Sequence, residues 1–528
     1  MSGNGVDSKD VPASFTIDGG VGSIAWTMAE IVDAAAGLAR TAQIMDPLLD
    51  RLRNERIWLA EACASATSVP SAVLDALVLA EWRCAAVQAA VAKLAHNASQ
   101  AAVNYAAAEA RSAQANAALS RLLALRDGWL TWLAGPLAPL KSAAEFIQWL
   151  DQVRDEGIRN ATEEVLRSGG AYVSGALGPG PALIYVLQGL RGQGTAGIGG
   201  KPPFLLRTLL DHANLTRPGT LSVRAVPVQE WGGAGLVRPL QSPAAGPLAV
   251  APAGQPWNME ATFQSVLAGS NDAYSYPPGS IGVVQIPRPD GSKVWVVHLP
   301  GTEDWSTLDS SNPFDMEGNL EALTAAHQAR FRQQEVIVQE LIMAALQAAG
   351  ALPGEDVLLT GHSGGGIHAA AAAASPAFLA TVNVRMIVIA GAPAGNAQVP
   401  AGIAVVGLEN EHDLVTAADF HTPPAHKNWV TATSHRPAVT GGAVEVVKQA
   451  HSMENYLHDA ALLDHSDDPA VRAAKQTLEK LLGVGAAGAA VAGGKWVFQG
   501  KDNAKHLQRT RPGSSAPVRG KDYVSGGR

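Results

Sequence analysis

The stretch that decides the fold is Asp356-Val-Leu-Leu-Thr-Gly-His-Ser363-Gly-Gly-Gly-Ile-His-Ala-Ala-Ala-Ala-Ala-Ala374. Residues 356–360 are mostly apolar and favour a buried β-strand. Residues 367–374 are almost all strong helix formers. Between them lies Gly-x-Ser-x-Gly, which at a sharp strand-to-helix turn holds the serine in a strained conformation with its side chain presented. The pattern therefore predicts Ser363 at the head of a helix, where free N–H groups favour negative charge.

The composition is that of a globular protein with more than one domain. The chain has 528 residues, too many for one ordinary core. Hydrophobic residues make up 47% and charged residues 16%, which does not indicate disorder. A net charge of −8 and a pI of about 6.0 give no general attraction to nucleic acid.

The N-terminus lacks the basic-then-apolar pattern of a secretory signal peptide, and no run of 18 apolar residues occurs. We therefore expect a soluble protein without a transmembrane segment, located in the cytoplasm unless it is exported without a cleaved signal. The two cysteines, Cys63 and Cys84, are expected to be core residues without a disulfide.

The N-terminal half is predicted to be helical. Residues 1–20 are expected to be disordered, and residues 21–175 are Ala-rich with apolar residues at helical spacing. This predicts an all-α helical bundle or extended helical hairpin. The expected helices are 28–52 with a kink or break at Pro47, then 55–66, 71–125 and 137–168.

The C-terminal half is predicted to be an α/β domain. Residues 176–258 are Gly- and Pro-rich and are expected to be a linker holding one helix (204–213) and one strand (221–231). Over residues 259–482 strands alternate with helices, including expected helices at 259–268, 320–349 and 469–482. This alternation predicts a mainly parallel sheet with flanking helices, opened by an antiparallel hairpin. Residues 483–528 are expected to be a flexible basic tail; from residue 495 on it carries net charge +6.

A nucleophilic serine needs a base, an acid that orients the base, and donors for an oxyanion. At a nucleophile elbow the order along the chain is serine, acid, histidine. Asp413 follows an expected strand at 403–408, with Glu409, Glu411 and Asp419 as alternatives. His451 follows the last strand-like segment, with His458 as the alternative.

The expected oxyanion hole consists of two backbone N–H groups. One belongs to Gly364, directly after the serine, and the other to Thr302, after the expected strand 293–299. Gly301 would allow the backbone close to a substrate. The alternative is an ordinary turn at the end of a strand.

Five short motifs in order resemble those of α/β-hydrolases, and most closely those of class 3 (fungal-type) lipases and esterases. They are Pro300-Gly-Thr-Glu-Asp-Trp305, Gly361-His-Ser-Gly-Gly365, Gly391-Ala-Pro-Ala-Gly-Asn396, Glu411-His-Asp-Leu-Val415 and His451-Ser-Met-Glu-Asn-Tyr456. The resemblance covers about residues 280–460. It implies an α/β-hydrolase fold, the triad Ser363, Asp413 and His451, and an oxyanion hole of Thr302 and Gly364.

The chain departs from the pattern of that family at three points. Gly364 stands where leucine is usual, Pro300 stands where arginine is usual, and the segment at Gly391 is one residue shorter. The first change removes bulk beside the serine. All three leave the identity of the substrate open.

The leading functional hypothesis is a carboxylic ester hydrolase that works through an acyl-enzyme on a small-molecule or lipid ester. The alternative is an interaction or secreted effector protein whose helical half binds a partner or self-associates, with the hydrolase-like half as cargo or inactive scaffold. No cofactor, metal or nucleic-acid motif occurs in the sequence.

Overall fold

The structure is a computed structural model. It describes residues 14–22, 24–64, 71–134, 207–208, 210–211, 219–232, 251, 253–304, 309–326, 336–418, 424, 426–435, 448–485 and 489–503. The chain divides into a hairpin unit, Gly22–Ser120, and a sheet unit formed by Met1–Val21 with Arg121–Arg528. The helix expected at residues 137–168 lies outside the described residues.

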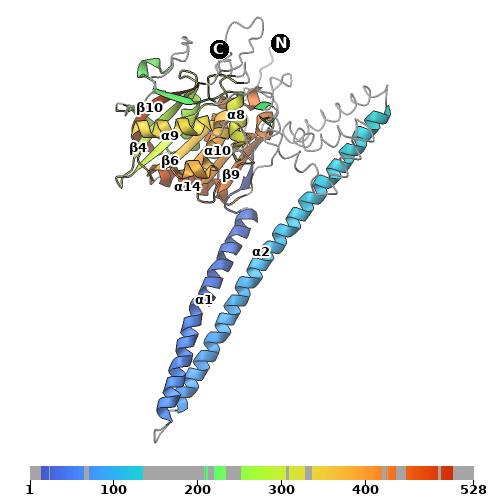
Figure 1. Cartoon of the computed structure of the whole chain (residues 1–528), viewed down its shortest axis with the longest axis vertical. Coiled ribbons are helices and arrows are strands. Elements are labelled where there is room, and N and C mark those ends of the chain that lie inside the picture. Colours follow the sequence, from blue (N-terminus) through green and yellow to red (C-terminus); the bar gives the residue numbers. More distant parts are fainter. Residues whose placement is uncertain are drawn as a thin grey trace. The chain divides into compact units, whose positions relative to one another are not determined.

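The hairpin unit consists of two long helices side by side, α1 (Ile24–Cys63) and α2 (Ser71–Ala134), of which α2 continues beyond the unit (Figure 1). Positions shielded from solvent recur in α1 at alternating spacings of three and four residues, as in a coiled coil. They are Ile31, Ala35, Leu38, Ala42, Met45, Leu49, Leu52, Arg56, Leu59 and Cys63. Near the tip, Arg53 and Arg56 bind Glu81 at 3.1 and 2.9 Å. The predicted helical hairpin is therefore present.

The sequence prediction placed the helix ends of α1 incorrectly. Pro47 lies inside one continuous helix, so the expected separate helix at 55–66 is wrong. Proline removes one helical hydrogen bond, but contacts along α2 hold the helix on both sides of it. The expected helix 71–125 is confirmed and extends to Ala134. Cys63 and Cys84 are free thiols.

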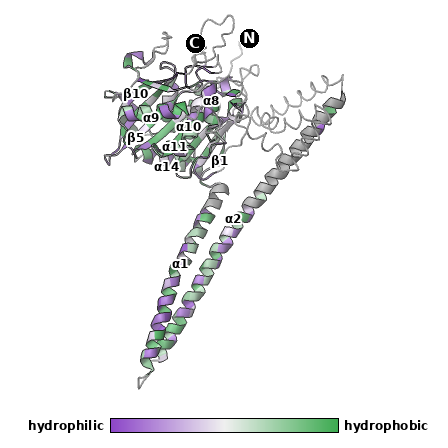
Figure 2. Ribbon diagram, in the orientation of Figure 1, coloured by the Kyte–Doolittle hydropathy of each residue, from purple (hydrophilic) through white to green (hydrophobic). Residues whose placement is uncertain are grey.

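Apolar residues also lie on the outside of the hairpin, interspersed with polar ones along both helices (Figure 2). Trp58 and Trp82 are 65% and 68% exposed. Among the described residues, no helix combines the length and apolar character needed to cross a membrane.

The sheet unit is built on a ten-stranded mixed sheet in the described part of the chain, with the order β1-β9-β8-β7-β6-β5-β4-β10-β2 and with β3 paired to β10. The strands are β1 (Ser14–Gly19), β2 (Leu221–Ala225), β3 (Gln255–Glu260), β4 (Ser280–Pro287), β5 (Lys293–Leu299), β6 (Asp356–His362), β7 (Asn383–Ala390), β8 (Ala404–Asn410), β9 (Trp429–His435) and β10 (Ala490–Asp502). The helices are α7 (Phe263–Ala273), α8 (Met316–Leu323), α9 (Ile337–Ala349), α10 (Gly364–Ala373), α11 (Pro376–Leu379), α13 (Met453–Leu463) and α14 (Pro469–Leu482).

The centre of the sheet is parallel. Strands β5 to β9 pair in parallel, whereas β4 joins β5 in an antiparallel hairpin. Beyond this centre, β10 pairs antiparallel with β4 and β1 pairs antiparallel with β9. The predicted α/β class is confirmed, with parallel central strands, flanking helices and an opening antiparallel hairpin. The sheet as a whole is mixed, because every pair outside that centre is antiparallel. The expected helix 469–482 is also confirmed, as α14.

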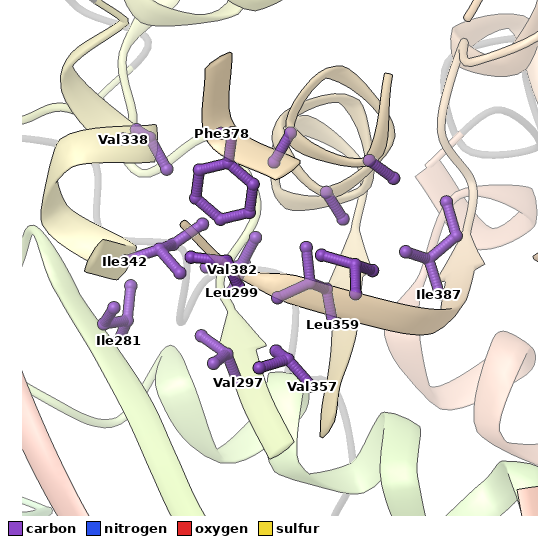
Figure 3. Close-up of a cluster of buried hydrophobic side chains, with 14 of the residues drawn as sticks. Ile281, Val297, Leu299, Val338, Ile342, Val357, Leu359, Phe378, Val382 and Ile387 are labelled. Carbon is purple, nitrogen blue, oxygen red and sulfur yellow. The ribbon is translucent and has the colours of Figure 1, made fainter. Parts of the chain in front are cut away.

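Successive residues of the central strands point to opposite faces and enter two separate cores. On β6, Val357 and Leu359 belong to one core, whereas Leu358 belongs to the other. The first core packs α9, α10 and α11 against the sheet and contains Val338, Ile342 and Phe378 (Figure 3). The second packs α7, α13 and α14 on the opposite face. Helices on both faces thus hold the carboxyl ends of the parallel strands in place.

Both segments expected to be flexible contain strands. Ser14–Gly19, within the expected disordered N-terminus, pairs with β9 along its whole length. Ala490–Asp502, within the expected flexible tail, pairs with β2, β3 and β4. The glycines and the lysine of β10 make its strand character hard to recognise in the sequence. Lys495 is buried against the Trp257 ring, whose centroid lies 3.4 Å from Nζ, and against Asp272 at 3.1 Å.

Three further boundaries differ from the prediction. The linker contributes β2, which ends at Ala225, and most of β3. The expected helix at 259–268 is wrong for its first residues, which complete β3, and the helix α7 starts at Phe263 because Thr262 caps it. The expected helix 320–349 is two helices, α8 and α9.

Candidate functional site

Ser363 occupies a strained turn between β6 and α10. Its φ of 53° and ψ of −121° make it the one non-glycine residue with positive φ in the described part of the chain. Its N–H donates to the carbonyl of Ala390 on β7 at 2.9 Å. A Cβ at Gly361 would lie 2.3 Å from the carbonyl carbon of Gly365, and one at Gly365 would lie 2.3 Å from the carbonyl oxygen of Pro300. Only glycine fits at these two positions, so the sequence of the turn determines its shape.

The structure brings together the three side chains expected to form the triad. His451 Nε2 lies 2.9 Å from Ser363 Oγ, and His451 Nδ1 lies 2.8 Å from Asp413 Oδ2. Asp413 is fully buried and Ser363 is 3% exposed. Because a carboxylate only accepts, Nδ1–H donates to Asp413, and Nε2 is left to accept the serine proton.

Asp413 is held in position by two further donors. Its Oδ1 accepts the N–H of Val415 at 2.9 Å, as the cap of a short 3₁₀ helix over Leu414–Ala417. Its Oδ2 accepts the phenol O–H of Tyr456 at 2.5 Å. Burial and the Asp413 charge raise the pKa of Tyr456 well above its ordinary value, so the phenol keeps its proton. A Cβ at Gly391, where φ is +60°, would lie 2.7 Å from the Tyr456 ring and 3.2 Å from Asp413 Oδ2.

The ring of His362 lies beside His451 and is hydrogen-bonded to its backbone. Its Nε2–H donates to the backbone carbonyl of His451 at 3.0 Å, and its Nδ1 then accepts the O–H of Tyr274 at 2.7 Å. Burial, and secondarily the neighbouring His451, lower the pKa of His362 to about 3, so its ring is neutral. No individual role was expected for Tyr274, His362 or Tyr456, because the role of a buried polar ring can be inferred only once its hydrogen-bond partners are known.

Among the alternative residues that the structure describes, none is a partner of His451, which binds Asp413 and Ser363. Glu411 binds His435 Nδ1 at 2.8 Å and lies beside the His412 ring. Asp419 lies outside the described residues. His458 is on α13, beyond the turn that carries His451. The bond to His451 therefore selects Asp413 among the described candidates.

Thr302 and Gly364 are adjacent, as expected for an oxyanion hole. An ideal Cβ on Gly364 would be 3.0 Å from the Thr302 nitrogen and 2.7 Å from its Oγ1. Gly364 is the first residue of α10, so its N–H has no acceptor within the helix. Asn319 of α8 donates from Nδ2 to Thr302 Oγ1 at 2.7 Å. Its own Oδ1 is buried and has no hydrogen-bond partner among the described residues, which costs about 1–3 kcal/mol.

Carboxylates gather beside this end of the sheet. Burial raises the pKa of Glu303 and of Asp315 to about 7 and that of Glu321 to about 8. Burial and the nearby Glu321 raise the pKa of Glu317 well above its ordinary value. Arg207, in the expected linker, donates to the carbonyl of Glu321 at 3.3 Å and to Thr324 Oγ1 at 2.7 Å. In the part of the chain that is described, no group of His, Cys, Asp or Glu is arranged to hold a metal ion.

Comparison with protein-family models found no match, and comparisons with curated proteins and with solved structures found none either.

Proposed function

We propose that this protein is a serine hydrolase that cleaves carboxylic esters through an acyl-enzyme. The single observation that carries the proposal is the unbroken chain of hydrogen bonds from Asp413 Oδ2 through both nitrogens of His451 to Ser363 Oγ. A serine hydroxyl is a weak nucleophile without a base. In this series of hydrogen bonds His451 is the base, and Asp413 orients it.

In the proposed reaction His451 Nε2 takes the proton of Ser363 as Oγ attacks the ester carbonyl. The negative charge on the carbonyl oxygen is stabilised by the N–H groups of Thr302 and Gly364. His451 then gives its proton to the departing alcohol. A water molecule, activated by the same imidazole, releases the acid and restores the serine. The Asp413 carboxylate orients the imidazole and stabilises the transient imidazolium.

The choice of esters rests on the resemblance of the motifs to α/β-hydrolases of the class 3 lipase type. The parallel centre of the sheet and the turn after β6 are compatible with an α/β-hydrolase fold. The preferred acyl-chain length of the substrate would decide between a lipase and an esterase. Ser363 itself is only 3% exposed.

The test is covalent labelling followed by turnover. A fluorophosphonate probe should label the wild-type chain, and the label should map to Ser363 and vanish in Ser363→Ala. The matched control is Ser375→Ala, which removes a helix-capping serine of α11 and leaves the site intact. Turnover of p-nitrophenyl esters of increasing chain length then separates an esterase from a lipase. Failure to label and to hydrolyse any ester would contradict the proposal.

A second function is favoured by the exposed tryptophans of the hairpin. We propose that the hairpin unit binds protein, through self-association or a partner, because Trp58 and Trp82 expose large apolar surfaces on a two-helix scaffold. Light scattering after size exclusion should detect assembly of the full chain that Trp58→Ser/Trp82→Ser weakens and Arg40→Ser/Gln43→Ser does not. A monomer at every concentration would exclude self-association. Binding to a different protein would then be the remaining possibility to test.

A further inference from the structure

Asn319 makes the side-chain contact to Thr302 within the proposed oxyanion hole. It is 7% exposed, lies in α8, and its N–H donates to the carbonyl of Asp315, the capping residue of that helix. Its Nδ2 donates to Thr302 Oγ1 at 2.7 Å. The Thr302 hydroxyl is thus fixed by an amide that the start of a helix holds in place.

The other end of the same carboxamide faces Gly364. A Cβ at Gly364 would lie 2.6 Å from Asn319 Oδ1 and 2.7 Å from Thr302 Oγ1, both closer than real Cβ atoms approach. The glycine after the serine is therefore the counterpart of Asn319: the carboxamide occupies the volume that a side chain at position 364 would need.

Packing alone does not explain a carboxamide at this place. Asn319 Oδ1 is buried, and no described residue donates to it, which is destabilising compared with an apolar side chain of similar size. The contact that only a polar group can make here is the hydrogen bond to Thr302. The residue is also uncharged, so it places no negative charge beside an oxygen that becomes negative.

We propose that Asn319 is a positioning residue that holds Thr302 against Gly364 in the oxyanion hole, and that Gly364 is the residue that makes room for it. The inference rests on the proposed ester hydrolysis. Asn319 acts through Thr302 and takes no part in proton transfer. Without this hydrogen bond Thr302 can shift away from Gly364, and the oxygen of the tetrahedral intermediate then meets a misplaced Thr302 N–H group.

The first experiment compares two buried asparagines. Asn319→Ala should lower kcat for p-nitrophenyl esters by about 10- to 100-fold with little change in KM, because donor placement matters in the transition state. The control is Asn312→Ala, which also removes a buried carboxamide but one that donates to Glu303 at 2.9 Å. If Asn312→Ala lowers kcat as much as Asn319→Ala does, the role is general support of the fold and the proposal is overturned.

The second experiment uses charge. Asn319→Asp should be slower than the wild type at alkaline pH, where the added carboxylate opposes the developing oxyanion. Its rate relative to the wild type should recover as the pH is lowered and the carboxyl group takes a proton. A ratio that stays constant with pH would overturn the electrostatic part of the argument.

The third experiment does not depend on activity. Gly364→Ala should lower the melting temperature of the wild-type chain by several degrees. Adding Gly364→Ala to Asn319→Ala should lower the melting temperature by less, because Thr302 and the shortened side chain at position 319 can move away from the added methyl group. Strictly additive shifts would overturn the steric pairing of residues 319 and 364. Absence of ester hydrolysis by the wild type would instead contradict the proposed function, and the two failures are thus distinguishable.

Discussion

The ring of His362 lies 4.8 Å from the ring of His451, centroid to centroid, and donates a hydrogen bond to its backbone carbonyl at 3.0 Å. Two imidazoles this close would repel each other if both were charged. Burial resolves the conflict by keeping His362 neutral, with a pKa of about 3. His451 can therefore accept a proton beside a ring that holds its backbone in place.

Removal of both nitrogens at position 362 should impair the proposed reaction. His362→Leu loses the bonds to His451 and Tyr274, and we expect kcat/KM to fall about tenfold or more from the loss of orientation. The matched control is His368→Leu, because in the described part of the chain neither nitrogen of that buried ring has a hydrogen-bond partner. It should retain activity and stability. Equal losses in the two variants would argue against a positioning role for His362.

Tyr456 should set the acid limb of the pH–rate profile. Tyr456→Phe removes the donor to Asp413 Oδ2 and leaves a carboxylate that attracts the imidazolium more strongly. We therefore expect the acid limb of kcat/KM to move to higher pH, by about one unit or less. Tyr105→Phe, on the hairpin, provides the control. An acid limb that does not move would show that the phenol is a packing element.

The glycine before His362 should be essential for folding. Gly361→Ala places a methyl group 2.3 Å from backbone atoms of Gly365, and neither the strand nor the helix can move away without loss of packing. We expect a loss of about 3 kcal/mol or more in the free energy of unfolding. Chemical denaturation measures it, with Gly402→Ala as the comparison, because a Cβ there meets nothing within 4 Å.

The buried carboxylates should make stability fall as the pH rises. Glu321 keeps its proton in the folded chain up to a pKa of about 8, whereas its ordinary value is 4.5. Between these values the folded state binds a proton that the unfolded state has released, so its contribution is complete below pH 4.5 and is lost as the pH rises through 8. His298, His362 and His368 act in the opposite sense: their pKa values of about 3 mean that stability is lost as the pH falls below 6.5.

Glu321→Gln isolates the carboxylate effect. The amide can still accept the N–H of Ile337, which Glu321 accepts at 3.2 Å, but it does not titrate. Its melting temperature should decline less than that of the wild type between pH 5 and pH 8, whereas the exposed Glu260→Gln should follow the wild type. Parallel pH curves for Glu321→Gln and the wild type would contradict a protonated Glu321.

The contact among Ser363, Asp413 and His451 could be predicted because Ser363 and Asp413 each follow an apolar strand and His451 comes after the last strand-like segment. The parallel strands bring their carboxyl ends to one edge, so chain order alone places the three residues together. Their catalytic role stays a prediction. The same reasoning placed Thr302 beside Gly364.

The supporting residues could not be predicted, for reasons that differ among them. Tyr274 follows α7, whose start is set by the Thr262 cap, and the helix was expected too early. Asn319 lies in a helix that starts at Met316 under the Asp315 cap, ahead of the expected start at residue 320. The strand β10 contains Lys495, and a buried lysine is acceptable there because it contacts the Trp257 and Tyr276 rings and Asp272.

The position of β10 has a consequence for how the protein is made. It is the last described strand to be synthesised, yet it lies between β4 and β2 and also pairs with β3. On the ribosome, the open edges of those three strands must wait for β10 to emerge, and unpaired edges invite wrong partners. We expect this part of the sheet to be completed only once β10 has been synthesised, and chaperones to protect the open strands until then.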